Sequence, residues 1–200
     1  MPRFSIELAK PSDDGDLRRL VAESPIGRGV QIVLRREPSF FHGVRVHGPF
    51  SQVGVVRDSR TGRVVGCGTR AVRSAYVNGT AANLGCLGGL LLESSFRSGT
   101  LLARGYRAFH QLHRDKKALL YVTTIPEDDR EVRELLTSGR AGLPQYDDWG
   151  RYYTLAISPG RKKRSLAGRT QVVRGSAARM EEVEDCLNRN GRQRQFFLTR

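Results

Sequence analysis

One stretch of the chain, residues 82–113, constrains the fold more than any other part of the sequence. Within it, residues 84–92 are apolar apart from their glycines. Because this run is too short to cross a bilayer and is bounded by polar residues, it favours a strand covered on both faces. Gly85, Gly88 and Gly89 remove side chains from that strand, which indicates a β-bulge or the close approach of another backbone or a ligand.

The strand is followed by a Ser/Gly-rich turn, residues 94–99, that contains one arginine, Arg97. Thr100 or Ser98 can cap the helix that comes next. The apolar residues of this helix repeat at helical spacing and are Leu102, Tyr106, Phe109 and Leu112. The turn therefore presents backbone N–H groups, a helix N-terminus and a guanidinium together, and this combination suits a phosphate.

Three strands are expected before the central one, at residues 4–9, 52–57 and 63–77. The last two form an antiparallel pair, and Asn78-Gly79 is a two-residue hairpin signal leading into the central strand. Between the first and second strands a helix is expected, with Ser12 as its cap. The apolar side of this helix consists of Leu17, Leu20 and Val21. Residues 26–49 suit another helix packed on the sheet, with Phe40 and Phe41 in the core.

A second continuous apolar run, residues 118–125, follows the central helix. It should lie parallel to the central strand, since a helix crosses between the two. Residues 128–137 then predict a helix that ends at Gly139, and residues 152–157 predict a further strand. The expected fold is α/β (α+β), with a mixed, mostly antiparallel sheet and a central parallel strand pair flanked by helices.

Residues 90–102 resemble the coenzyme A-binding core of the GNAT (N-acetyltransferase) superfamily. In that family a central strand ends in a V-x-V-x-P-E-Y-R-like segment, and a pyrophosphate turn of the R/Q-x-x-G-x-G/A type and a helix follow. The V, V, P, E, Y and R places are occupied here by Leu90, Leu92, Ser94, Ser95, Phe96 and Arg97. Two departures stand out: Gly99 comes two residues after Arg97 rather than three, and Leu102 stands where the last small residue would be.

The resemblance implies that the two parallel strands splay apart and that the pantetheine arm of acetyl-CoA enters the gap between them. The arm would run along Leu90, Leu91 and Leu92, with Thr123 and Thr124 across the gap. Plain β propensity is an equally good explanation of both threonines. The pyrophosphate would lie on the turn and the first helical residues, namely Arg97, Ser98, Gly99, Thr100, Leu101 and Leu102.

The resemblance also implies transfer of an acetyl or other acyl group from acyl-CoA to an amine, by direct attack of the amine on the thioester. Backbone N–H groups at the bulge would polarise the thioester carbonyl. Glu93 is the candidate base, directly or through water, although a solvated carboxylate explains it as well. Many family members protonate the departing thiolate with a tyrosine late in the helix of residues 128–137, but this chain has none there. Tyr146 is the nearest replacement; its hydroxyl could equally anchor a loop.

Two other function classes compete with an acyltransferase. A noncatalytic module that binds coenzyme A or a metabolite would explain the missing late-helix tyrosine. A basic nucleic-acid-binding domain would explain the net charge of +14. However, no RNP-like aromatic strand and no zinc-finger spacing accompany that charge, so nucleic acid is disfavoured as a partner. The acceptor is expected to be a small-molecule or protein amine.

The cysteines and histidines predict no metal site. Cys67, Cys86 and Cys186 have no C-x-x-C spacing and are expected to be reduced core thiols of a cytoplasmic protein. The four histidines form no ligand cluster in the sequence. The opening residues, MPRFSIELAK, are mixed in polarity, so neither a signal peptide nor a membrane segment is expected.

The chain is expected to divide into an acetyl-CoA-binding domain, residues 1–160, and an appended unit, residues 161–200. The appended unit comprises a basic linker, a short strand at residues 171–173 and a helix at residues 176–188. The helix residues expected to point inward are Met180, Val183, Cys186 and Leu187. This unit would begin a second domain that the chain does not complete, and it would dock on the first domain or pair with a second copy in a homodimer. Alternatively, it supplies the last strand of the first domain's own sheet.

Overall fold

The computed structural model describes residues 2–27, 31–96, 100–139, 143–153 and 179–199. Its strands join in one five-stranded sheet, in the order β1-β2-β3-β4-β5. The strands are β1 (Phe4–Leu8), β2 (Phe50–Asp58), β3 (Val64–Val77), β4 (Thr80–Leu92) and β5 (Leu120–Val122). The helices are η1 (Pro11–Asp13), α1 (Asp14–Ala22), α2 (Phe40–Arg45), η2 (Ser94–Phe96), α3 (Leu101–Leu112), η3 (His113–Asp115), α4 (Arg130–Thr137) and α5 (Met180–Gly191).

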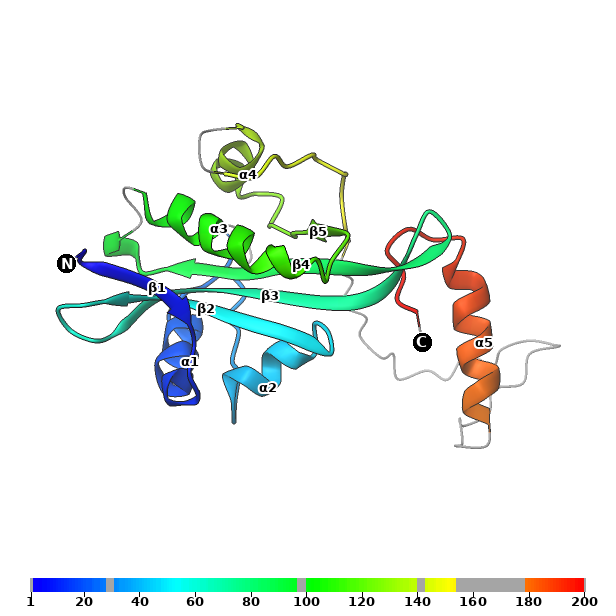
Figure 1. The fold of residues 1–200 in the computed structure, drawn as a ribbon, viewed down its shortest axis with the longest axis horizontal. Coiled ribbons are helices and arrows are strands. Elements are labelled where there is room, and N and C mark those ends of the chain that lie inside the picture. The colour runs from blue at the N-terminus through cyan, green and yellow to red at the C-terminus, as the bar shows by residue number, and fades with distance from the viewer. Residues whose placement is uncertain (1, 28–30, 97–99, 140–142, 154–178, 200) are drawn as a thin grey trace, which may run out of the picture.

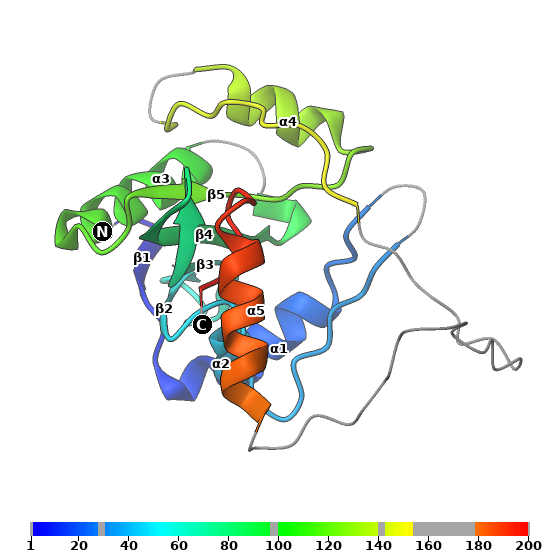
Figure 2. The same cartoon turned by 90° about the vertical axis from the view of Figure 1, so that its right-hand side faces the viewer.

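The sheet topology confirms the predicted fold class. Strands β1 to β4 form an antiparallel meander, whereas β4 and β5 run parallel. They are parallel because α3 crosses from the end of one to the start of the other. Helices α1 and α2 lie on one side of the sheet, and α3 and α4 lie on the other (Figures 1 and 2).

The largest core cluster fills the space between α1, α2 and the sheet. Its residues alternate along β2 and repeat at helical spacing along α1: Leu17, Leu20, Val21, Phe40, Val44, Val53, Val55, Val64 and Cys67. On the opposite face the ring of Phe109 lies against two glycines, Gly54 and Gly68, where a Cβ would be 3.4 and 3.0 Å from its atoms. Phe40 is a core residue, as its sequence context predicts.

The expected cap at Ser12 is wrong. Ser12 lies inside the short helix η1, and α1 begins at Asp14. The side chain of Asp13 accepts a hydrogen bond from the backbone N–H of Lys10 at 2.8 Å, so a carboxylate closes this turn instead of the Ser12 hydroxyl. Asp14 then accepts bonds from Ser39 Oγ and the N–H of Phe40, both at 2.9 Å, which tie α1 to the start of α2.

The C-terminal segment docks on the far end of the β3–β4 hairpin (Figure 1). β2 pairs with β3 only as far as Val72, which leaves the last residues of β3 with a free edge. Residues 196–199 take that edge: Tyr76 and Phe197 share a 2.8 Å backbone bond, and Ala75 is bridged to Leu198. Nearby, the ring of Trp149 stacks on Phe196, with centroids 5.0 Å apart.

The predicted inward face of α5 is wrong for three of its four residues, since Met180, Val183 and Cys186 are exposed. The helix contacts the hairpin through its C-terminal end, where Gly191 lies against Phe197 and Tyr76, so its first turns face solvent. Tyr152 and Tyr153 are exposed and irregular rather than in a strand. The rest of that expected strand and the one at residues 171–173 lie outside the described residues.

Candidate active site

The parallel pair β4–β5 opens into a gap. The two strands are paired only from Leu84↔Leu120 to Cys86↔Val122, whereas β4 continues to Leu92. β5 is therefore shorter than the run at residues 118–125 predicted. Directly after β5, the hydroxyl of Thr123 donates to the carbonyl of Leu87 at 3.1 Å, in place of a backbone ladder bond. Beyond that point no described strand pairs with this edge of β4.

A β-bulge lies at the opening of the gap, which is one of the two features that the glycines of the central strand indicated. The β3–β4 register shifts between Cys67 and Thr69, and Gly89 has a φ of +57°. A Cβ on Gly89 would meet only ordinary contacts at 3.5 Å, so conformation rather than space favours glycine there. The Thr69 hydroxyl holds the bulge by donating to the Gly88 carbonyl at 2.8 Å. Leu90, the next residue, is 46% exposed, while Leu91 and Leu92 are half-buried.

Three hydroxyl groups meet beside this gap. The Tyr146 hydroxyl lies 3.1 Å from Thr123 Oγ1 and 3.3 Å from the Tyr106 hydroxyl on α3. Because the single Thr123 proton goes to the Leu87 carbonyl, Tyr146 donates to Thr123, and Tyr106 can donate to Tyr146. Burial and the bond to Tyr146 raise the pKa of Tyr106 above its ordinary value. The structure thus brings together Thr123 and Tyr146, whereas Thr124 is exposed.

Tyr106 is a candidate site residue that the sequence analysis missed, because its hydroxyl contacts that of Tyr146. Its helical spacing predicted only that the side chain faces inward. That prediction is confirmed, since Tyr106 is buried. No sequence signal links it to Tyr146, which lies 40 positions away along the chain.

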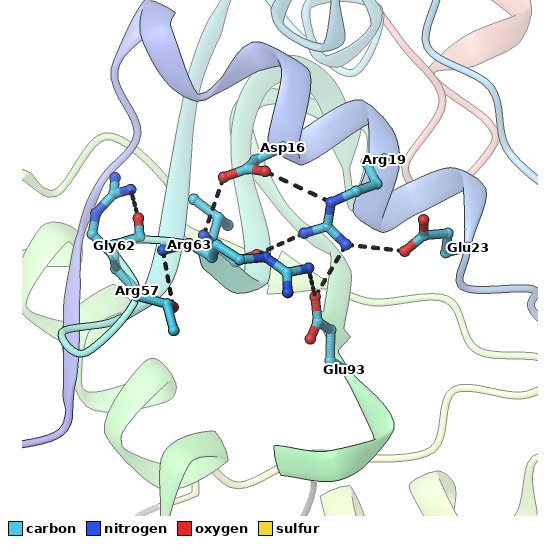
Figure 3. Close-up of polar contacts among 9 residues, drawn as sticks. Asp16, Arg19, Glu23, Arg57, Gly62, Arg63 and Glu93 are labelled. Atoms are coloured by element: carbon cyan, nitrogen blue, oxygen red, sulfur yellow. Dashed lines mark hydrogen bonds and ion pairs between the residues drawn. The ribbon is translucent and has the colours of Figure 1, made fainter.

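Glu93, the candidate base, forms ion pairs with two arginines at the end of β4 (Figure 3). Its Oε1 lies 3.1 Å from Arg19 Nη1 and 3.5 Å from Arg63 Nη2. The backbone N–H of Glu93 donates to the Val65 carbonyl at 2.9 Å, which fixes the residue beside β3. Arg19 belongs to α1, so Glu93 lies on the α1 side of the sheet, whereas Tyr146 contacts α3. No contact joins Glu93 and Tyr146 in the part of the chain that the structure describes.

The predicted phosphate turn is only partly described, because Arg97, Ser98 and Gly99 lie outside the described residues. Thr100 is the N-cap of α3, and its side chain makes no capping bond. Leu101 is buried and Leu102 half-buried. A cavity of about 250 Å³ lies beside this helix start. Two of the residues that line it are arginines. The full lining consists of Arg3, Phe4, Ser95, Phe96, Thr100, Leu101 and Arg104.

The described residues include no group of His, Cys, Asp and Glu that could hold a metal ion. All three cysteines are free. Burial raises the pKa of the Cys67 thiol to about 12, which fits a core thiol, but Cys186 is exposed and not in the core. Among the described helices, none has the length and apolar character needed to span a membrane.

No protein-family model matches the sequence, and no curated protein matches it either. Solved structures do match. A Trypanosoma brucei acetyltransferase is 17% identical with a TM-score of 0.53, covering 77% of this chain and 99% of that one. Ribosomal-protein-alanine N-acetyltransferase from Brucella melitensis biovar Abortus 2308 is 15% identical, with a TM-score of 0.54 and coverages of 76% and 99%.

A third match is AAC(6′)-Iy, whose structure contains a bisubstrate analogue of coenzyme A, CoA-S-monomethyl-acetylneamine. It is 14% identical with a TM-score of 0.54, covering 78% of this chain and all of that one. At identities this low, the structural similarity shows the fold alone. That fold is the one of the GNAT superfamily.

Proposed function

We propose that this protein is a coenzyme A-dependent N-acyltransferase, which moves an acetyl or other acyl group from acyl-CoA to an amine. The observation that carries the proposal is the β4–β5 gap, with a bulge on one side and the Thr123 and Tyr146 hydroxyls on the other. The matched structures, which include a complex with a coenzyme A analogue, support the same class of reaction.

The residues present fit acetyl-CoA. The edge of β4 at Leu90, Leu91 and Leu92, beyond its pairing with β5, is where the amide-containing arm would run. The uncapped start of α3 at Thr100, with Leu101 and Leu102, offers N–H groups to the pyrophosphate, together with Arg97, Ser98 and Gly99. When bound, the coenzyme supplies the thioester that the amine attacks. Backbone N–H groups at the bulge then stabilise the charge that develops on the carbonyl oxygen.

Two side chains are assigned the proton transfers. Tyr146 holds a proton at its hydroxyl and delivers it to the departing thiolate, and Tyr106 keeps that hydroxyl oriented. Glu93 accepts the proton of the amine, directly or through water. The ion pairs with Arg19 and Arg63 use only one oxygen of Glu93, Oε1, so its Oε2 takes part in neither.

A second candidate function is a noncatalytic module that binds coenzyme A or a related metabolite. The observation that favours it is the engagement of Glu93 by two guanidinium groups, an arrangement that a purely structural carboxylate would also show. Turnover distinguishes the two functions, because a binding module releases no free thiol from acetyl-CoA in the presence of amines.

Calorimetric titration with acetyl-CoA tests whether the protein binds the coenzyme, which both functions require. The wild-type protein should bind, and Arg97→Ala should weaken binding by about 1–3 kcal/mol, the range for a lost charge-assisted hydrogen bond. Arg60→Ala is the matched control, since Arg60 is exposed in the turn between β2 and β3 and should not affect binding. Absence of binding at millimolar acetyl-CoA would refute the proposed function.

A further inference from the structure

A cluster of three basic side chains lies on the α2 side of the sheet. Arg36, from the connection between α1 and α2, lies with Nη2 3.5 Å from Nε2 of His47, the second residue after α2. Arg73 lies on β3, and its Cβ would be 3.3 Å from a Cβ on Gly48, the residue after His47. We call Arg36, His47 and Arg73 the basic cluster.

The backbone places these residues together by close packing. A Cβ on Gly48 would lie 2.5 Å from the Val72 carbonyl oxygen and 3.3 Å from the Arg73 Cβ, so only glycine allows the chain after α2 to approach β3 this closely. On the other side, Arg36 donates from Nη1 to the Gly43 carbonyl at 2.8 Å, and its side chain covers Gly43. The positions of Arg36 and His47 are therefore fixed by the ends of α2.

Among the described residues, the basic cluster has no counter-charge. Arg19, Arg57 and Arg70 each pair with carboxylates, but no carboxylate of the described residues is within ion-pairing distance of Arg36 or Arg73. The Nε of Arg73 is buried and has no hydrogen-bond partner among the described atoms. Burial, followed by the charges of Arg36 and Arg73, lowers the pKa of His47. Since a buried unpaired donor and uncompensated like charges both cost stability, this arrangement suits a negatively charged ligand.

The basic cluster lies on the same face of the sheet as Cys86 and Gly88 of β4. Arg73 is opposite Leu84 in the β3–β4 register, and Gly88 is four residues further along β4. At about 3.3 Å per residue, the bulge is roughly 13 Å from the position opposite Arg73. An amine placed at the bulge could therefore belong to a molecule whose other end reaches the cluster.

We propose that Arg36, His47 and Arg73 bind an oxyanion, a carboxylate or a phosphate, carried by the acyl acceptor. The acceptor is then an amine with an acidic group roughly 13 Å from the reacting nitrogen. As a statement about the acceptor this rests on the proposed function, but the anion site itself can be tested without acyl transfer.

The first experiment follows the imidazole signals of the protein by NMR while inorganic phosphate or acetate is added. Bound anion should raise the pKa of His47, and Arg73→Gln and Arg36→Gln should each weaken the response about ten-fold or more. Arg60→Gln is the matched control. Arg36→Gln keeps the test valid if Arg73→Gln does not fold, because Arg36 lies on a connecting segment. A His47 signal that ignores both anions, or that shifts equally in the variants, overturns the site.

The second experiment compares acceptors in pairs, each an amine with a terminal carboxylate or phosphate and its uncharged amide or alcohol. The charged member should have a KM about ten-fold lower, and Arg73→Gln should remove that difference while leaving acetyl-CoA affinity unchanged. Equal KM values within the pairs overturn the acceptor assignment. A protein whose His47 responds to phosphate but which binds no acetyl-CoA retains the anion site and refutes the proposed function.

Discussion

The hydroxyl of Tyr146 lies between the end of β5 and α3, bonded to Thr123 after β5 and to Tyr106 on α3. Tyr146→Phe should lower turnover about a hundred-fold, because the departing thiolate then has no positioned proton donor. Acetyl-CoA affinity, measured by calorimetry, should change less than two-fold, since Phe keeps the ring packing against Tyr106. Tyr152→Phe, at an exposed tyrosine, is the control. Unchanged turnover in Tyr146→Phe would show that Tyr146 has only a structural role.

Arg70 is the most buried charged side chain among the described residues, with 0% exposure. Its guanidinium donates two bonds to Asp115, at 2.9 and 2.7 Å, and further bonds to Gln52 and Tyr121. These bonds connect β3 to β2, β5 and η3. Arg70→Ala should therefore lower the free energy of unfolding by about 3–5 kcal/mol, because it leaves several polar groups without their partner. Arg60→Ala, in an exposed turn, should change it by less than about 0.5 kcal/mol.

The same pair predicts acid sensitivity. The hydrogen bonds from Arg70, followed by that from the Lys117 N–H, lower the pKa of Asp115 to about 2 from 3.8. A carboxyl group with a depressed folded-state pKa stabilises the fold above its unfolded pKa and loses that contribution as the pH falls through the folded value. The urea midpoint of the wild type should thus fall between pH 4 and pH 2.

Asp115→Asn provides the comparison for this pH dependence. The variant should be less stable than the wild type at pH 7 and should lose less stability between pH 4 and pH 2. Asp147→Asn, at an exposed position, should keep the wild-type slope. Identical slopes in Asp115→Asn and the wild type would contradict the assignment of this acid-sensitive step to Asp115.

At the scale of single elements, β4 combines two requirements in one strand. Its middle, from Leu84 to Cys86, pairs on both sides and needs Gly85, where a Cβ would lie 2.3 Å from the Tyr121 ring. Its second half pairs on one side only and needs the bulge at Gly89. The strand is therefore regular where it supports the sheet and irregular beyond its pairing with β5.

Two glycine substitutions should have opposite effects on stability. Gly89→Ala should destabilise the protein by about 1–2 kcal/mol and weaken acetyl-CoA binding, because alanine is strained at a φ of +57°. Gly105→Ala lies inside α3, with no atom within 4 Å of the new Cβ, and should stabilise it by about 0.5–1 kcal/mol. Thermal unfolding of both variants measures these changes in stability. A Gly89→Ala protein with wild-type stability and affinity would show that the bulge does not depend on glycine.

At the scale of the whole molecule, the segment at residues 161–200 remains a predicted appended unit. The described contacts of residues 196–199 with β3 and of Trp149 with Phe196 show how its end meets the rest of the chain. If it is an appended unit, a nick in the basic linker should leave both pieces folded and associated through these contacts.

A lysine-specific protease can cut the chain within the basic linker. The chain has only five lysines, and Lys162 and Lys163 are the two in the linker. Cleavage there should leave a core that binds acetyl-CoA and co-elutes with the C-terminal fragment on gel filtration. A core that unfolds once the fragment is removed by dilution would assign the segment to the first domain instead.

Most of the element order could be predicted from the sequence, because hydrophobic periodicity reports a strand or helix face locally. The central strand, the helix after the turn and the parallel strand pair follow from residues 82–125 alone. The strand glycines left a bulge or a close approach open, and the register shift and the φ of +57° at Gly89 show the bulge. The inward face expected for α5 was wrong because apolar spacing shows which side of a helix is apolar, not whether the chain supplies a surface to cover it.

Only the tertiary structure placed the side chains of the site. Tyr106 and Tyr146 are brought together because α3 and the chain after α4 both lie beside β5, a relation that no local pattern encodes. The pairing of Glu93 with Arg19 and Arg63, the buried Arg70 and the basic cluster around His47 likewise join residues far apart in sequence. The sequence by itself determined which segments become strands and helices, because that depends on neighbouring residues. The packing of the layers decided which charges and hydroxyls meet, because that depends on distances across the fold.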